Sequence, residues 1–361
     1  MNIDKIIAST LSSTPDSRLL LTPEEMGIKS QLAVEGTQLS LSLSAGFPTQ
    51  LLQDTLVPAI TSTLKQALPN YQITVTLDQF IKAHRTQLPG HALRGVKNTI
   101  AIASGKGGVG KSTVAVNLAT ALARAGARVG ILDADIYGPS IPLMLGKVSP
   151  VQMSGERYLP VQAHGVQAMS IGYLTDDAAL IWRGPMLAKS LIQMLDITQW
   201  DELDYLFIDL PPGTGDIQLS LVQKIPLTAS IIVTTPQNVA TMDAQKALKM
   251  FERTSIHVLG IIENMSLHIC SKCGHQETIF GHGGANKLCQ THQCKLLGQL
   301  PLDARIGTHC DQGMPTAATG TDDLASAFIK TALLAAIELS KRPLNYADKF
   351  PPIVQEEIKT P

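Results

Sequence analysis

The pattern of apolar and polar positions along the chain changes near residue 98. Before this point, two segments alternate polar and apolar side chains, as half-buried strands do, and one segment between them has apolar positions at helical spacing. The alternating segments are residues 38–44 and 71–77, and the helical segment is residues 51–68. These patterns predict a small α+β domain over residues 1–82.

Proline and glycine mark two irregular segments. Pro89, Gly90 and Gly95 interrupt both periodicities, so residues 83–97 are predicted to form a linker. Residues 341–361 are rich in proline and are predicted to form an irregular C-terminal tail.

From residue 98 to residue 340, short apolar runs without alternation follow one another, with helical segments between them. Runs of this kind are typical of strands that are covered on both faces of a parallel sheet. The predicted strands are residues 99–104, 128–132, 205–208, 230–234, 258–262 and 296–300. Helices such as residues 112–125, closed by Gly126, fill the crossovers. The predicted fold class is therefore α/β, with a mostly parallel central sheet flanked by helices.

The loop after the first of these strands is suited to binding phosphate. Residues 105–112 are Gly-Lys-Gly-Gly-Val-Gly-Lys-Ser, between an apolar strand and an apolar helix, which is the context that a P-loop requires. The glycines let backbone N–H groups converge on phosphate oxygens, and the helix N-terminus adds its dipole. Lys111 is expected to reach the β- and γ-phosphates of ATP, and the Ser112 hydroxyl to bind Mg²⁺. The predicted nucleotide-binding residues here are Gly105, Lys106, Gly107, Gly108, Val109, Gly110, Lys111, Ser112 and Thr113.

Three aspartates stand at the carboxyl ends of two other predicted strands, the edge at which open α/β sheets bind ligands. Asp133 and Asp135 follow the second strand, and Asp209 ends the third. Asp135 is expected to orient the water that attacks ATP, and Asp133 to support the magnesium shell. Asp209 is expected to hold Mg²⁺ through water. The site is thus predicted to be that of a P-loop ATPase.

Lys106 is a second lysine, directly after the first glycine of the loop, and an ordinary P-loop does not need it. The pattern Gly-Lys-Gly-Gly-x-Gly-Lys-Ser resembles the deviant Walker group, which includes the nitrogenase iron protein and the Min and Par ATPases. The resemblance implies a homodimer in which Lys106 crosses the interface and touches the partner's nucleotide. It adds Lys106 to Lys111 and Asp135 as expected catalytic residues.

Several longer segments resemble the Mrp/ApbC family of iron–sulfur cluster carriers with ATPase activity. They are residues 133–140, 182–186, 209–216, 263–266, 269–275 and 279–281. The resemblance covers residues 98 to 302, and residues 1–82 also look like a small assembly-factor domain. It implies that Asn264 reads the adenine edge and that the Pro301–Asp303 loop flanks the base. It further implies a labile 4Fe–4S cluster that is received from scaffold proteins and passed to apo-proteins.

All five cysteines lie between residues 270 and 310, which suggests metal or redox chemistry rather than disulfides. Cys270 and Cys273 form a C-x₂-C pair, and in the resembled family such pairs from two subunits bind the cluster. Together with Cys289 and Cys294 they also approach a zinc-ribbon spacing, C-x₂-C-x₁₅-C-x₄-C. Further possible zinc ligands are His275, His282 and His292, whereas Cys310 is expected to be an incidental thiol.

The overall composition limits the partners. A net charge of -1 gives no bulk attraction to nucleic acid or to an anionic membrane, and 4% aromatic residues disfavour a stacking platform for single strands. The most apolar segment, residues 324–339, is interrupted by charges and is predicted to be an amphipathic helix. We therefore expect a cytoplasmic protein that binds neither nucleic acid nor membrane. The alternatives are a ParA/MinD-like spatial ATPase, or an ATP-dependent assembly chaperone with structural zinc and no cluster.

Overall fold

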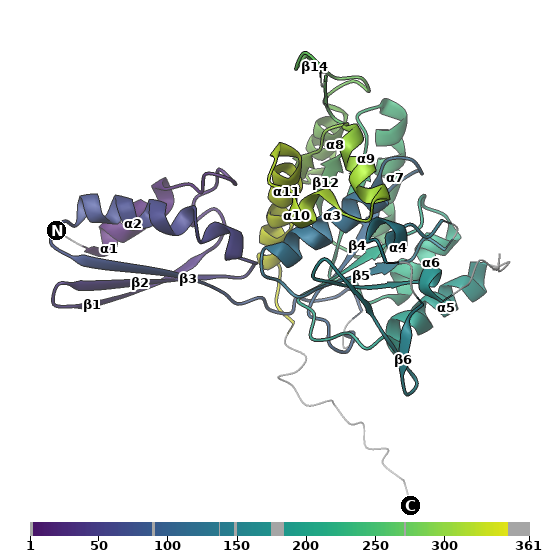
Figure 1. Ribbon diagram of the computed structural model, residues 1–361, viewed down its shortest axis with the longest axis horizontal. Helices are drawn as coiled ribbons and strands as arrows, with labels where there is room; N and C mark the ends of the chain where they lie inside the picture. The colour runs from purple at the N-terminus through teal and green to yellow at the C-terminus, as the bar shows by residue number, and fades with distance from the viewer. Residues whose placement is uncertain are drawn as a thin grey trace, which may run out of the picture.

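Two separate sheets organise the chain, one near the N-terminus and one in the larger part of the molecule (Figure 1). The computed structural model describes residues 3–88, 91–136, 138–147, 150–174, 184–270 and 272–345. The Trp182–Arg183 part of one family-like segment, and the tail beyond residue 345, lie outside the described residues.

The N-terminal sheet has three strands in the order β1-β2-β3, with two helices on one face (Figure 1). Its elements are α1 (Ile3–Ser13), β1 (Lys29–Glu35), β2 (Gln38–Ala45), α2 (Leu56–Ala67) and β3 (Gln72–Gln79). Leu39, Leu41 and Leu43 are buried, as the alternation predicts, and β3 runs parallel to β2 after the crossover through α2. The sequence patterns did not indicate β1 or α1. The predicted helix starts at residue 56, because residues 50–52 form a separate 3₁₀ turn.

The larger sheet has eight strands in the order β15-β12-β11-β4-β10-β5-β9-β8. They are β4 (Thr99–Ala103), β5 (Val129–Asp133), β8 (Val161–Ala163), β9 (Val166–Ser170), β10 (Tyr205–Asp209), β11 (Ala229–Thr234), β12 (Val258–Glu263) and β15 (Leu296–Gln299). All neighbours pair in parallel except β8 and β9 at one edge. The six predicted strands and the α/β class are confirmed, and β8 and β9 are additions.

Helices cover both faces of this sheet. They are α3 (Lys111–Arg124), α4 (Ile141–Met144), α5 (Gly184–Ile197), α6 (Asp216–Lys224), α7 (Asn238–Arg253), α8 (Gly284–His292), α9 (Ala304–Asp311), α10 (Thr316–Thr319) and α11 (Asp323–Ser340). Ile100 and Ile102 of β4 pack in one core cluster with α3 and α11, whereas Ala101 and Ala103 pack in another with α5 to α8. No helix among the described residues is both long and apolar enough to cross a membrane.

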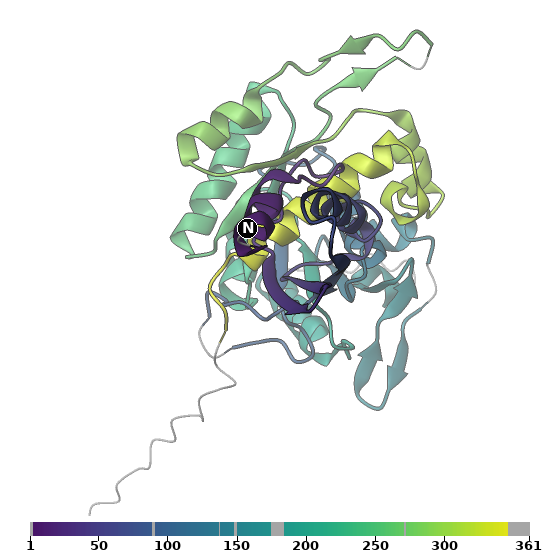
Figure 2. The ribbon, with the colours of Figure 1, turned by 90° about the vertical axis from the view of Figure 1, so that its left-hand side faces the viewer.

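Two small hairpins extend from the larger part of the chain. One joins β6 (Gln152–Ser154) to β7 (Arg157–Leu159), and the other joins β13 (His268–Ile269) to β14 (Gln276–Glu277). The β13–β14 hairpin projects away from the central sheet in both Figure 1 and Figure 2. Its turn therefore lies at the outer surface of the molecule.

The predicted linker is irregular but well anchored. The Asn345 N–H donates to Ala83 O at 2.9 Å, and the Arg85 N–H donates to Pro343 O at 3.0 Å. The first residues of the predicted tail therefore pair with the linker. The side chain of Gln79 reaches across the junction, and its Nε2 donates to Gly126 O at 2.8 Å.

Candidate functional site

The loop between β4 and α3 combines left-handed backbone with close approach to its neighbours. Gly108 and Gly110 both have φ of +79°, a region that disfavours side chains, and Gly110 directly precedes α3. A β-carbon at Gly110 would lie 2.3 Å from Asn264 Nδ2, and one at Gly105 would lie 2.1 Å from the backbone carbon of Asp243. Gly105 is therefore also required because α7 packs directly against this loop.

A buried ion pair connects the loop to β10. Lys111 Nζ lies 2.6 Å from Asp209 Oδ1, and both side chains are almost completely buried. The Ser112 Oγ lies 3.4 Å from the same ammonium group. The predicted phosphate lysine and the two predicted magnesium-binding side chains thus lie close together.

Asp133 lies beside Asp209, because the parallel pairing of β5 with β10 puts these two residues in register. Its carboxylate is fully buried and accepts hydrogen bonds from the Ser170 hydroxyl and from the Ile141 and Asp135 N–H groups, at 3.1 to 3.2 Å. Burial, reinforced by the negative charge of Asp209, raises the pKa of Asp133 to about 7. Two buried carboxylates therefore share one lysine.

This donor set fits a divalent cation. Asp209 Oδ2 is buried and has no hydrogen-bond partner among the described residues, a situation that proteins normally avoid. Carboxylate oxygen and a nearby hydroxyl are the ligands that Mg²⁺ prefers, and the excess negative charge would be balanced by it. Asp209 and Ser112 are the residues that would hold the ion.

The predicted adenine contacts occupy different environments. Asn264 is buried, and its Nδ2 donates to Val109 O of the phosphate loop at 2.9 Å. Asp303 caps α9 by accepting from the Arg305 N–H at 2.8 Å, and it pairs with the Arg305 guanidinium at 2.7 Å. Hydrogen bonds from Arg305 lower the pKa of Asp303. Pro301 lies two residues after the end of β15 and two residues before this cap.

The C-x₂-C pair lies in the turn of the projecting β13–β14 hairpin. The Cys270 N–H donates to His275 O at 2.9 Å, and the Gly274 N–H donates to Cys270 O at 2.8 Å. Cys273 is exposed and Cys270 is partly exposed. Hydrogen bonds from the backbone N–H groups of Lys272 and Cys273 lower the pKa of the Cys270 thiol, which favours the thiolate that binds metal.

A family model for ParA-type proteins, described as NUBPL iron-transfer P-loop NTPase, matches residues 95–338. The matched region contains both the phosphate loop and the cysteine hairpin. The chain belongs to the NUBPL iron-transfer P-loop NTPase family.

Curated relatives carry a consistent name. The iron-sulfur cluster carrier protein of Haemophilus influenzae is 56% identical over 252 residues, which cover 69% of this chain and 68% of the relative. The protein of the same name from Escherichia coli K12 is 59% identical, over 62% of each chain. That of Synechocystis is 41% identical over 92% of this chain and 96% of its own length.

Two solved structures are similar to this chain. A nucleotide-binding protein from Archaeoglobus fulgidus, in complex with ADP, is 39% identical with a TM-score of 0.54, and covers 61% of this chain and 87% of its own. The cell division ATPase MinD of Pyrococcus furiosus, at 23% identity and a TM-score of 0.50, shares the fold, over 66% of this chain and 97% of its own.

The four cysteines of the zinc-ribbon spacing form two separate pairs in this member of the NTPase family. Cys289 and Cys294 contact each other at the end of α8, away from the hairpin pair. Among the described residues, no three His, Cys, Asp or Glu side chains are close enough to hold a metal ion together. Cys310 is buried on α9, and its sulfur lies 3.9 Å from Asn117 Nδ2.

Two residues near the site were not among the predicted site residues. Ser170 holds Asp133 from the end of β9, and Glu263 accepts from the Ala285 N–H at 2.8 Å and from Gln299 Nε2 at 2.7 Å. A polar residue at the carboxyl end of a parallel strand is the signal for Ser170. Ser170 was not predicted to be a site residue because residues 166–170 were not predicted to form a strand.

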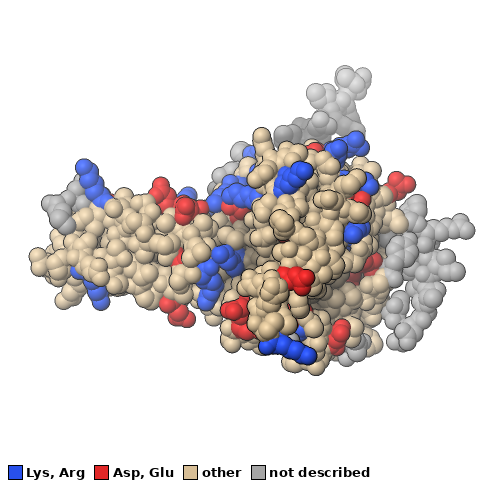
Figure 3. Space-filling view, turned by 90° about the horizontal axis from the view of Figure 1, so that it is seen from above, with Lys and Arg blue, Asp and Glu red and all other residues tan. Residues whose placement is uncertain are grey.

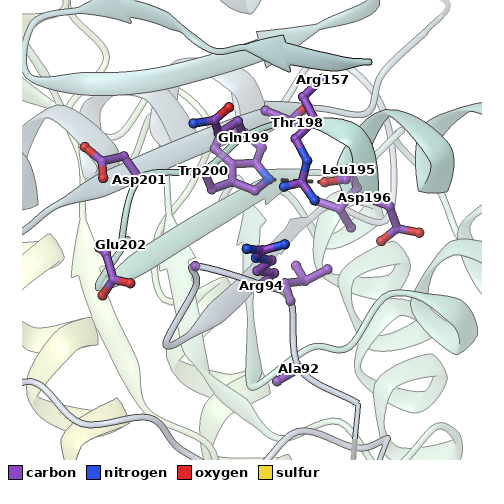
Figure 4. Close-up of a pocket in the computed structure, with 12 residues that line it drawn as sticks. Ala92, Arg94, Arg157, Leu195, Asp196, Thr198, Gln199, Trp200, Asp201 and Glu202 are labelled. Carbon is purple, nitrogen blue, oxygen red and sulfur yellow. Dashed lines mark hydrogen bonds between the residues drawn. The ribbon is translucent and has the colours of Figure 1, made fainter. Parts of the chain in front are cut away.

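A cavity of about 630 Å³ lies at the other end of the sheet strands (Figure 4). It is lined by charges of both signs just before β4 and β10, including Arg94, Asp201 and Glu202, whereas the phosphate loop follows β4. The Trp200 indole N–H beside it donates to Leu195 O at 3.2 Å. On the face drawn in Figure 3, the described Lys and Arg residues stand in small groups among Asp and Glu.

Proposed function

We propose that this protein is a homodimeric ATPase that carries a 4Fe–4S cluster as cargo and transfers it to apo-proteins. The observation that carries the proposal is the exposed Cys270–Cys273 pair on a projecting hairpin of a chain that also holds the deviant phosphate loop. Relatives at 41–59% identity are named iron-sulfur cluster carrier proteins, which supports the same function.

ATP binding and hydrolysis are assigned to the buried group of side chains around Lys111. On binding Mg-ATP, Lys111 would exchange the Asp209 carboxylate for the β- and γ-phosphates, and Asp209 would then face the cation. Mg²⁺ would neutralise charge on the phosphates, and Ser112 and Asp209 would hold it. Asp135 would orient the attacking water, and Lys106 would reach the nucleotide of the partner subunit.

Binding of the iron–sulfur cluster is inferred from the number of cysteine ligands that each chain offers. A 4Fe–4S cluster takes four thiolates, and each chain offers two in the hairpin turn, so two subunits complete one cluster. An exposed position suits a cluster that is handed on. The remaining pair, Cys289 and Cys294, lies at the end of α8 and is not required.

The test compares two matched double variants after anaerobic reconstitution with iron and sulfide. Cys289→Ser/Cys294→Ser should keep about four irons per dimer, as the wild type does, whereas Cys270→Ser/Cys273→Ser should keep none. Iron, sulfide and zinc are measured per chain, and transfer is followed as recovery of activity in an apo iron–sulfur enzyme.

Two results would favour the alternatives. Tightly held zinc that is lost with a collapse of thermal stability in Cys289→Ser/Cys294→Ser would indicate a structural metal site and a chaperone role. Absence of iron from the reconstituted wild type, with ATP-dependent binding to DNA or to vesicles, would indicate a spatial ATPase.

A further inference from the structure

The cysteine pair that the proposed function does not use is built into the end of helix α8. Gln293 ends the helix in the left-handed conformation, with φ of +51°, and its N–H donates to Cys289 O. The Cys294 N–H donates to the same carbonyl at 3.1 Å. In a helix end of this type, the residue after the left-handed position packs against the side chain at the start of the last turn. Here both of these residues are cysteines.

The backbone geometry therefore brings the two cysteines close together, which a disulfide requires. Because the Gln293 and Cys294 N–H groups both donate to Cys289 O, the backbones of the two cysteines lie against each other, and a disulfide requires α-carbons roughly 4.4–6.8 Å apart. The interaction between the two thiols lowers the pKa of Cys294 and raises that of Cys289. Cys294 is partly exposed, whereas Cys289 is only 7% exposed.

We propose that Cys289 and Cys294 form a reversible disulfide by exchange with a low-molecular-weight disulfide, at a redox-modification site separate from the cargo cysteines. Cys294 is the attacking thiolate, because it is the one that solvent reaches. Cys289 is the resolving thiol behind it.

The exchange takes two steps. The Cys294 thiolate attacks one sulfur of the small disulfide, so that the reagent's S–S bond breaks, a mixed disulfide forms and one thiolate leaves to take up a proton. Cys289 then gives its proton to solvent and attacks the Cys294 sulfur. The protein disulfide forms and the second small thiolate leaves, so two cysteines are oxidised while one small disulfide is reduced to two thiols. Excess small thiol reverses both steps.

The position of the pair links it to the nucleotide site. In the first turn of α8, the Ala285 N–H donates to the Glu263 carboxylate. Asn264, which follows Glu263 in the chain, donates through its side-chain Nδ2 to Val109 O of the phosphate loop. A disulfide would fix the last turn of α8 to the segment that enters β15. Oxidation would therefore restrain the helix that supports Glu263 and Asn264.

Peptide mapping tests the proposal, because trypsin separates the cysteines cleanly. Cleavage after Lys287 and Lys295 yields residues 288–295 with both cysteines, while Cys270, Cys273 and Cys310 fall in three other peptides. Iron-free protein is equilibrated anaerobically with oxidised and reduced glutathione in a series of ratios, and free thiols are then blocked. We expect the 288–295 peptide to become lighter by two hydrogens, and reduced glutathione to restore its mass.

Single variants test the order of attack. Cys289→Ser should stop at a mixed disulfide of Cys294 with glutathione, whereas Cys294→Ser should leave Cys289 as a free thiol. The proposal is overturned if both thiols of the 288–295 peptide stay reduced at ratios that oxidise Cys270 and Cys273. It is equally overturned if Cys289 in the Cys294→Ser variant reacts with oxidised glutathione as fast as Cys294 does in the Cys289→Ser variant.

Two substitutions at the helix end test the geometric cause. Gln293→Gly keeps the left-handed conformation. It should leave unchanged, or slightly lower, the ratio of oxidised to reduced glutathione at which half of the protein carries the disulfide. Gln293→Val disfavours that conformation and should require an about tenfold higher ratio of oxidised to reduced glutathione. Identical ratios in the two variants would show that the cap does not hold the thiols together. Thermal unfolding of each variant checks that the fold is kept.

Discussion

Lys111 and Asp209 form a buried ion pair, with 2.6 Å between Nζ and Oδ1, although they are 98 residues apart along the chain. The pair means that the phosphate lysine is already held by a carboxylate before any nucleotide arrives. Because Asp133 lies in register beside Asp209, this single ammonium group also moderates the repulsion between two buried acids.

Replacement of Lys111 should therefore affect both stability and binding. Lys111→Ala should abolish tight ATP binding and destabilise the nucleotide-free protein by about 3–5 kcal/mol, because it leaves buried carboxylates without a cation. Lys111→Met/Asp209→Asn should regain most of that stability without regaining ATP affinity. Calorimetric titration and thermal unfolding measure the two effects. Lys106→Ala, in the same loop, is the control that should unfold like the wild type, and wild-type ATP affinity in Lys111→Ala would refute the site.

The contact of Asn264 with the phosphate loop gives a matched pair of glycine variants. Gly108 and Gly110 share a φ of +79°, but only at Gly110 would a β-carbon meet a side chain, Asn264 Nδ2 at 2.3 Å. Both alanine substitutions should cost about 1–2 kcal/mol of backbone strain. Gly110→Ala should additionally weaken ADP binding, and Asn264→Ala should partly relieve this in the double variant. Equal ADP affinities of Gly108→Ala and Gly110→Ala, measured by calorimetry, would show that the contact is unimportant.

Much of the site could be predicted because its signals are local. The phosphate loop needs only a short run of glycines and lysines between a strand and a helix, and Asp133 and Asp209 lie together because parallel strands end at one edge. Contacts that depend on the packing of distant elements could not be predicted. The approach of α7 to Gly105, the support of Asp133 by Ser170 and the separation of the two cysteine pairs all depend on such packing.

Asp135 should separate binding from chemistry. Its backbone N–H donates to Asp133 Oδ1 at 3.1 Å, and Asp135→Ala leaves this bond intact, so the buried carboxylates should keep their arrangement. ATP binding should stay close to that of the wild type, while hydrolysis should fall about 10²–10⁴-fold through loss of the water-orienting group. Turnover of labelled ATP and calorimetric titration provide the comparison. If binding and hydrolysis fall together, Asp135 has a structural role instead.

His84 should make the stability of the linker region depend on pH. It is buried, and its Nδ1 lies 2.9 Å from Asn98 Oδ1; burial lowers its pKa below the usual value. The unfolded chain then binds more protons than the folded one as pH falls through the ordinary histidine range, so stability should decrease on acidification. Thermal midpoints measured between about pH 5 and pH 7.5 should vary less in His84→Gln than in the wild type. His282→Gln, an exposed control, should keep the wild-type dependence.

Lys106 provides the test of action across the dimer. Its side chain is partly exposed, and it makes no ion pair among the described residues, so it is available to a second subunit. Lys106→Ala and Asp135→Ala should each lose most ATP hydrolysis as homodimers. When they are mixed, one site of the hybrid dimer lacks both residues and the other lacks neither, so activity should recover toward about half of the wild-type value per hybrid. Subunit exchange is verified by mass spectrometry with an isotopically labelled partner. Activity that never exceeds that of the parents, despite proven exchange, would place Lys106 at its own subunit's nucleotide.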